Sequence, residues 1–146
     1  MIAVIQRVLE ASVVVEGEII GKIGPGLLVL AAIQPGDSEK QLAWMAGKIT
    51  SLRIFRNGEK HFDVDVQQIG GEILLVSQFT LAADATQGRR PSFIGAAKPE
   101  EAELLFARFV EIVRATGVPT QTGKFAADMK VALMNDGPAT FILRTD

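Results

Sequence analysis

Two short segments carry polar residues that a purely structural role explains poorly, and the first follows an apolar run. It is Ser77-Gln78-Phe79-Thr80-Leu81, in which three polar side chains surround one aromatic ring. Burying such groups without hydrogen-bond partners costs about 1–3 kcal/mol each, so a cluster of this kind at a strand end usually faces water or a ligand. The segment is therefore a candidate substrate site, with a solvated strand end as the alternative.

The second segment, Asn135-Asp136-Gly137-Pro138-Ala139-Thr140, joins two strongly apolar stretches. Asn, Asp, Gly and Pro are the commonest turn residues, so a plain reverse turn is the simplest interpretation. However, an X-Pro bond is where a cis peptide costs least, and about 5–6% of such bonds in folded proteins are cis. A fixed Gly137-Pro138 unit would also present backbone carbonyls with no side chain in front of them, which suits it to test the chirality of a ligand.

Other catalytic and cofactor chemistries have little support in the sequence. The only histidine, His61, lies in a charged segment beside a predicted turn, so we expect it to be solvated and not part of a Ser-His-Asp triad. The chain has no cysteine, which removes thiolate nucleophiles and cysteine-ligated zinc. Asp63 and Asp65 are interpreted as two solvated carboxylates, and no glycine-rich segment matches a phosphate-binding loop. We predict no metal and no cofactor.

The composition is that of one folded domain, residues 1–146, with 48% hydrophobic and 22% charged residues. A formal charge of −2 argues against a protein that coats nucleic acid by charge alone, and no DNA partner is expected. The N-terminal stretch lacks a signal-peptide pattern, and no apolar run approaches the roughly 18–20 residues of a membrane helix. We therefore expect a cytoplasmic protein that does not associate with a membrane.

The elements that must position these segments alternate between strands and helices. Ser38 can cap a helix whose Leu42, Met45 and Ile49 form one apolar stripe, and a second helix begins at Pro99 and ends before Gly117. The order predicts an α/β fold: a single domain with layers α/β/β, in which two helices cover a mixed sheet and a second sheet, or else a partner subunit, closes the other face. Alternation and β-branched content predict strands at Ala3–Gln6, Ser12–Val15, Glu18–Ile23, Leu27–Ala32, Ser51–Phe55, Glu72–Gln78, Lys130–Met134 and Ala139–Leu143.

Together, Ser77–Leu81 and Asn135–Thr140 resemble the paired signature of the D-aminoacyl-tRNA deacylases, the D-tyrosyl-tRNA deacylase family. The resemblance implies hydrolysis of the ester bond of D-aminoacyl-tRNA, and also of glycyl-tRNA mischarged on tRNA-Ala, while L-aminoacyl-tRNA is rejected. The similarity spans the whole chain and includes Gln6-Arg7-Val8, Ala11-Ser12-Val13, Gly26–Leu30, Leu52–Phe55, Gly70-Gly71-Glu72, Gly88–Phe93, Thr122–Phe125 and Asp128-Met129.

The resemblance also implies a homodimer whose active sites lie at the interface. Gly137-Pro138 would be cis and would insert into the pocket of the partner, beside the segment equivalent to Ser77–Thr80. There the carbonyls would hold the α-amino group of the substrate, and an L side chain would collide with the Gly-Pro unit, whereas glycine would pass. The 2′-hydroxyl of the terminal adenosine would help activate water, and backbone N–H groups around Phe79 and Thr80 would stabilise the oxyanion.

Individual roles follow from the same resemblance. Ser77, Gln78, Phe79 and Thr80 form the catalytic segment, in which Ser77 and Thr80 shape the site and hydrogen-bond, with a covalent nucleophile as the lesser alternative. Arg7 is a candidate brace for the Gly-Pro loop, with a surface arginine at a strand edge as the alternative.

The remaining candidates contact the 3′ end of the aminoacyl-tRNA. Phe125 and Met129 would line the adenosine or aminoacyl pocket, or else pack in the core. Arg89 and Arg90 are candidate phosphate-binding residues, or else solvated loop residues. No base-reading motif is present, which suits an enzyme that acts on many tRNAs.

Three positions depart from the family pattern: the segment Lys60–Asp65, Ala82 and Ala139. They bear on side-chain preference and on the tightness of the pocket more than on the reaction. Two other functions are compatible with the residues. One is a non-catalytic, nucleic-acid-associated dimer on the same scaffold, and the other is a general esterase that uses Thr80 or Ser77 covalently.

Overall fold

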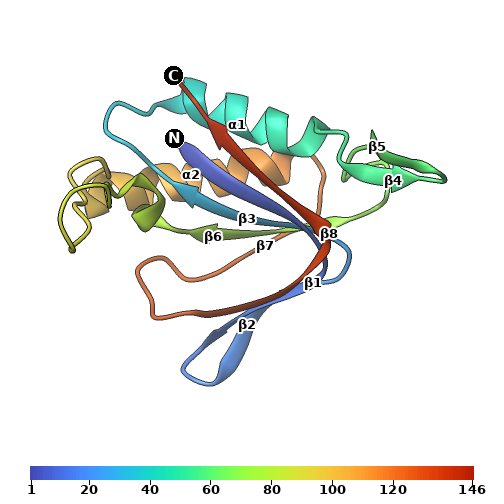
Figure 1. Cartoon of the computed structure of the whole chain (residues 1–146), viewed down its shortest axis with the longest axis horizontal. Helices are drawn as coiled ribbons and strands as arrows, with labels where there is room; N and C mark the ends of the chain where they lie inside the picture. The colour runs from blue at the N-terminus through green and yellow to red at the C-terminus, as the bar shows by residue number, and fades with distance from the viewer.

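Two long strands, β1 (Ile2–Val15) and β8 (Lys130–Arg144), pair antiparallel along nearly their whole length. The computed structural model describes all residues, Met1–Asp146, and joins four more strands to this pair in one mixed sheet. The first half of β1 pairs with β3 and its second half with β2, while β3, β6 and β7 run parallel to one another. Because β1 changes partner half-way, the sheet folds over itself, as Figure 1 shows. The bounds are β2 (Glu18–Ile23), β3 (Gly26–Ala32), β6 (Glu72–Ser77) and β7 (Thr120–Thr122).

Helices α1 (Glu39–Ser51) and α2 (Pro99–Ala115) lie together on one face of the sheet (Figure 1). Both were predicted at these places, and both begin with the expected residues. The Ser38 N–H donates to the Gln41 side chain over 2.9 Å, which closes the first turn of α1, and Pro99 is the first residue of α2, where its missing N–H costs nothing. Neither helix is long and apolar enough to cross a membrane.

The core has two parts because β3 and β6 are buried on both faces. Leu27 and Val29 face the helices, whereas Leu28 faces the second cluster, and Ile73 and Leu74 divide in the same way on β6. The folded-over part of the sheet covers this second cluster. The predicted α/β/β layering is therefore confirmed, with the closing layer supplied by the same continuous sheet.

The predicted division of the long strands is wrong. Ala3–Gln6 and Ser12–Val15 both belong to β1, and the two C-terminal strands are both parts of β8. The reverse turn, which was the simplest interpretation of Asn135–Pro138, is a bulge in β8 instead. Pairing passes from Val8↔Asn135 to Gln6↔Thr140, so Arg7 alone lies opposite the four residues between them.

A small antiparallel hairpin stands apart from the main sheet. It consists of β4 (Phe55–Asn57) and β5 (Lys60–Val64). The prediction of a strand at Ser51–Phe55 is wrong, because α1 continues to Ser51 and only Phe55 belongs to a strand. β5, β7 and the short 3₁₀ helix η1 (Phe79–Ala82) were not predicted, since β5 is charged and largely exposed, and β7 and η1 are only three and four residues long.

Candidate active site

A cavity of about 470 Å³ opens where β6 ends. Its walls are the end of β6 with the start of η1, the residues that lead into α2, and the loop between β7 and β8. Five residues predicted from the sequence line it together: Ser77, Gln78, Phe79, Phe125 and Met129. The rest of the lining is mostly apolar, and its only ionisable side chain is Asp128.

The strand end is held by backbone and side-chain hydrogen bonds of Gln78. The Gln78 N–H donates to the Ala31 carbonyl over 2.8 Å, and its side-chain amide donates to the Thr80 hydroxyl. Thr80 is exposed and is not part of the cavity wall, so its hydroxyl is linked to the wall only through Gln78. The first hydrogen bond of η1 runs from the Leu81 N–H to the Gln78 carbonyl, so the N–H groups of Phe79 and Thr80 have no partner within the helix.

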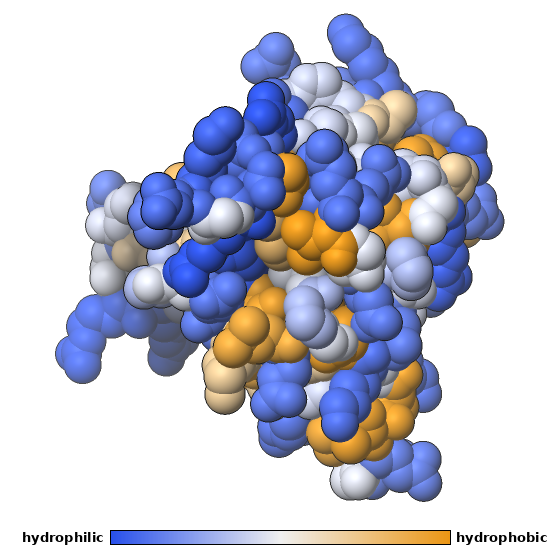
Figure 2. Space-filling model, turned by 90° about the vertical axis from the view of Figure 1, so that its right-hand side faces the viewer, coloured by the Kyte–Doolittle hydropathy of each residue, from blue (hydrophilic) through white to orange (hydrophobic).

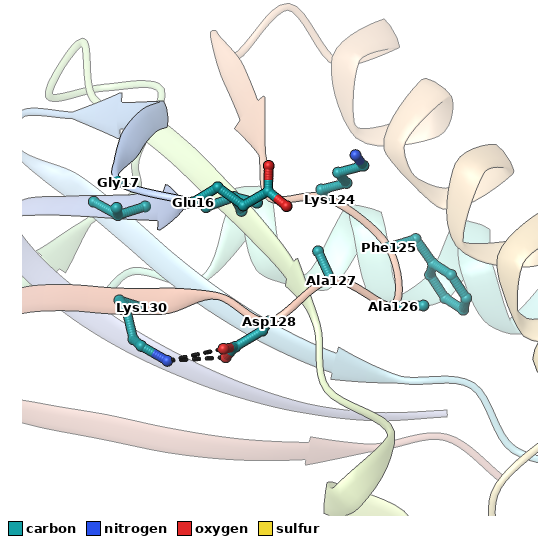
Figure 3. A pocket seen from close by; sticks show the side chains of 10 residues that line it. Glu16, Gly17, Lys124, Phe125, Ala126, Ala127, Asp128 and Lys130 are labelled. Atoms are coloured by element: carbon teal, nitrogen blue, oxygen red, sulfur yellow. Dashed lines mark hydrogen bonds and ion pairs between the residues drawn. The ribbon is translucent and has the colours of Figure 1, made fainter.

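The β7–β8 loop separates this cavity from a wider and more polar hollow of about 610 Å³ beside the β1–β2 turn (Figure 3). In Figure 3 the Phe125 ring points toward α2 and away from Glu16, and its centroid lies 6.3 Å from that of Phe106. Met129 packs on the second core cluster. Phe125 and Met129 therefore pack on the core and also line the cavity wall.

The structure does not bring Gly137 and Pro138 to the cavity of their own chain. Both are exposed, their peptide bond is cis, and Gly137 has φ +145°, a conformation that L residues rarely adopt. Asn135, to which sequence reasoning gave no role, joins the two ends of the bulge. Its Oδ1 accepts from the Ala139 N–H over 2.7 Å, and its Nδ2 donates to the Thr140 hydroxyl over 2.9 Å.

Arg7 is buried behind this bulge, at 3% exposed, and so is not a surface arginine. Its Nε donates to the Asp136 carbonyl over 2.8 Å and its Nη1 to the Ile54 carbonyl over 2.7 Å. The Phe62 ring lies over the guanidinium, 5.5 Å from ring centroid to Cζ. A buried guanidinium with two backbone acceptors and an aromatic cover has one well-defined position, so it can fix the backbone next to Gly137.

The β4–β5 hairpin supplies part of this support. Arg56 approaches the Asp136 carboxylate to 3.9 Å, and Arg53 pairs with Asp63 over 3.0 Å. Asp63, interpreted from the sequence as a solvated carboxylate, keeps a side-chain exposure of 17% and also accepts a hydrogen bond from Asn57, which lowers its pKa. His61 lies exposed on β5, away from the cavity wall. The segment that departs from the family pattern thus contacts, through Phe62, the arginine that holds the Gly-Pro bulge, a relation that no local sequence signal reveals.

Arg89 and Arg90 lie exposed in the loop that follows η1. The loop is closed at its base by Asp84 and Ser92, which exchange two backbone hydrogen bonds of 2.8 Å. Neither arginine forms an ion pair within the chain, and both are free to contact an external anion. No cluster of three or more His, Asp or Glu side chains is placed to hold a metal ion.

Comparison with known proteins gives a consistent family. A family model described as D-Tyr-tRNA(Tyr) deacylase matches residues 4–144. D-aminoacyl-tRNA deacylase of Pelobacter propionicus is 56% identical, with 98% of this chain and 99% of its own length covered. The corresponding protein of Geobacter metallireducens is 54% identical, with 99% and 96% covered.

Two solved structures are also similar. One, described as a c-Myc DNA unwinding element binding protein, is 43% identical with a TM-score of 0.95, and 100% of this chain and 99% of that chain are covered. Another, described as a probable eukaryotic D-amino acid tRNA deacylase, has a TM-score of 0.81 with 97% of both chains covered, and at 18% identity it shows the fold alone.

Proposed function

Because the chain belongs to the D-Tyr-tRNA(Tyr) deacylase family and is a hydrolase of D-aminoacyl-tRNA, we propose how it selects and cleaves its substrate in the cytoplasm. It hydrolyses the ester between a D-amino acid and the 3′-terminal ribose, and releases both. It accepts glycyl-tRNA mischarged on tRNA-Ala and spares L-aminoacyl-tRNA. The terminal adenosine and the amino acid occupy the cavity between Ser77–Phe79 and the β7–β8 loop.

The proposal rests on the distance, within one chain, between the polar strand end and the Gly137–Pro138 unit, which the reaction needs together. The polar strand end lines a cavity, whereas the exposed Gly137–Pro138 unit of the same chain does not reach it. A homodimer supplies what is missing, because the bulge of one subunit can enter the cavity of the other. The bulge suits this role, since Arg7 and Asn135 hold it from behind and leave its outer side free.

The surface around β8 supports such a dimer. β8 pairs only with β1, so its other edge is unpaired, and Leu133, Met134 and Ile142 on it are 38%, 50% and 61% exposed. Figure 2 shows apolar residues gathered between charged ones on the face of the molecule that forms the right-hand side of Figure 1. An unpaired long edge with apolar side chains is a surface that proteins normally cover.

Selection in this dimer is steric. The Gly-Pro carbonyls hold the α-amino group of the substrate, and the backbone then occupies the space into which an L side chain would point. Rejection by collision with a braced backbone is more stringent than preferential attraction. Glycine has no side chain to collide with the Gly-Pro unit, so glycyl-tRNA is accepted together with the D-aminoacyl-tRNAs.

Catalysis relies on the substrate and on backbone groups. As the family resemblance implies, the 2′-hydroxyl of the adenosine activates the attacking water. The cavity wall carries no histidine or lysine, and its single carboxylate, Asp128, is ion-paired with Lys130 over 2.9 Å. The unpartnered N–H groups of Phe79 and Thr80 stabilise the developing oxyanion, where one such donor is commonly worth about 10²–10³ in rate. Arg89 and Arg90 contact phosphates of the tRNA.

The test measures hydrolysis rates of matched D-aminoacyl-, L-aminoacyl- and glycyl-tRNA with the purified protein. We expect cleavage of the D and glycyl esters and persistence of the L ester. If the D-aminoacyl and glycyl esters both persist, the proposal is wrong.

Two other functions have distinct signatures. A covalent esterase mechanism through Ser77 or Thr80 predicts loss of activity in the double variant Ser77→Ala/Thr80→Ala, whereas the substrate-assisted mechanism predicts that activity is reduced but retained. A DNA-binding role is suggested by the description of the 43% identical structure. It predicts binding of DNA with a steep dependence on salt and no turnover of aminoacyl-tRNA.

A further inference from the structure

Phe79 and Phe93 form an exposed aromatic pair at the mouth of the cavity. Their ring centroids are 5.2 Å apart at an interplanar angle of 59°, and the residues are 53% and 43% exposed. Phe79 is also part of the cavity wall, so the pair continues the cavity outward. Two aromatic rings that pack against each other beside a substrate cavity, and that stay exposed, offer apolar faces to a ligand.

The pair is fixed in place by the loop that carries Phe93. Asp84 and Ser92 close this loop immediately before Phe93, and at Gly95 an added Cβ would lie 2.7 Å from the Ala82 carbonyl oxygen. The segment that follows Phe93 therefore contacts the end of η1 so closely that only glycine fits at position 95. Phe93 is thus held in a defined position next to Phe79.

The same loop places positive charge next to the rings. Arg89 and Arg90 lie between Asp84 and Ser92, both exposed and without an ion-pair partner in the chain. The one carboxylate nearby, that of Asp84, is engaged by the N–H and hydroxyl of Thr86. Exposed aromatic faces combined with free arginines are the usual means of holding single-stranded nucleic acid without reading its sequence.

We propose that Phe93, supported by Phe79, is a stacking platform for the base of the unpaired nucleotide that precedes the terminal adenosine, with Arg89 and Arg90 on the phosphates of that strand. The inference rests on the proposed function, since the terminal aminoacyl-adenosine must fill the cavity for its neighbour to reach the platform. Stacking tolerates any base, which suits an enzyme that acts on many tRNAs. The contact increases affinity for the tRNA and takes no part in the chemical step.

The test compares two substrates with the same ester: D-aminoacyl-tRNA and 3′-O-(D-aminoacyl)adenosine, which lacks the preceding nucleotide. For Phe93→Leu we expect the ratio of kcat/KM for the tRNA to kcat/KM for the adenosine ester to fall about tenfold, mainly through KM for the tRNA. Phe93→Trp should restore the ratio, because it restores an aromatic face. Trp44→Leu removes another exposed aromatic residue, on α1, and serves as the matched control with an unchanged ratio.

A second variant, Arg89→Gln/Arg90→Gln, should lower the same ratio and reduce the dependence of kcat/KM on salt for the tRNA only. The inference is overturned if both substrates lose activity equally in Phe93→Leu, if the ratio is unchanged, or if the variant converts a dimer to monomers, since the rings would then belong to a subunit interface. Failure of the wild type to cleave either ester would instead refute the proposed function, and the two failures are therefore distinguishable.

Discussion

Asn135 is the side chain that joins the two ends of the Gly137–Pro138 bulge. We expect Asn135→Ala to leave the N–H of Ala139, a residue only 4% exposed, without its acceptor, and to lower the free energy of unfolding by about 1–3 kcal/mol. The loosened bulge should also cleave D-aminoacyl-tRNA more slowly and discriminate less against the L ester. Denaturant unfolding and the D-to-L rate ratio measure the two effects.

Asn135→Asp is the matched control, because a carboxylate keeps the acceptor for Ala139 and can accept from the Thr140 hydroxyl. It should retain most of the stability and of the discrimination. An Asn135→Ala protein with wild-type discrimination would show that the bulge keeps its shape without this contact.

The surroundings of Gly137 come from the fold and not from the local sequence. An added Cβ would lie 2.9 Å from both the Arg7 guanidinium and the Ala139 nitrogen of its own chain. Gly137→Ala therefore displaces the Arg7 guanidinium as well as the Gly-Pro loop. Arg7 and Asp136 are 129 residues apart in the chain, and no local pattern indicates that they bond.

Among the elements, the helices and the buried strands could be predicted because their periodicity is local. Leu42, Met45 and Ile49 reveal a helix without knowledge of what they contact. β5 and β7 could not be predicted, since β5 is charged and β7 is the polar segment Thr120–Thr122, and each is extended only because a partner strand holds it. A reverse turn was the simplest interpretation of Asn135–Pro138 for the same reason, because Arg7, which lies opposite the bulge, is at the other end of the sequence.

A group of charged side chains joins α1 to α2. Arg108 on α2 donates to Glu39 on α1 over 3.0 Å and to Glu111 over 3.0 Å. The hydrogen bond from Arg108 holds the pKa of Glu39 below its usual value of 4.5. A carboxylate with a lowered folded-state pKa stabilises the fold above the unfolded-state pKa, and this contribution is lost as the pH falls through the folded-state pKa.

Glu39→Gln should therefore lower the denaturant midpoint at pH 7, and the difference from the wild type should shrink once the pH falls below 4.5. Because the pair is exposed, high salt should reduce the difference as well. Unfolding curves at pH 7 and pH 3, each at low and high salt, measure it. A difference as large at pH 3 as at pH 7 would mean that packing of the side chain, and not the ion pair, is responsible.

On the scale of the whole molecule, the folded-over sheet explains why the proposed site needs a second subunit. β6 and η1 carry the cavity, while the bulge lies in the middle of β8, on the outer side of β1. The two are separated by the strands that connect them, so rotation of side chains cannot bring them together. A second subunit docked on the unpaired edge of β8 can supply the bulge, at an interface of about 800 Å² per partner for a dimer of ordinary stability.

Complementation between two defective subunits tests this arrangement directly. Gly137→Ala damages the bulge, and Ala127→Trp fills part of the cavity with an indole, so each homodimer should be inactive. A heterodimer of the two, isolated through two different affinity tags, contains one site in which an intact bulge meets an intact cavity. It should therefore cleave D-aminoacyl-tRNA at about half the rate of a doubly tagged wild-type dimer. If each site were instead built within one chain, every site in the heterodimer would carry a defect, and its activity would stay at the level of the two inactive homodimers.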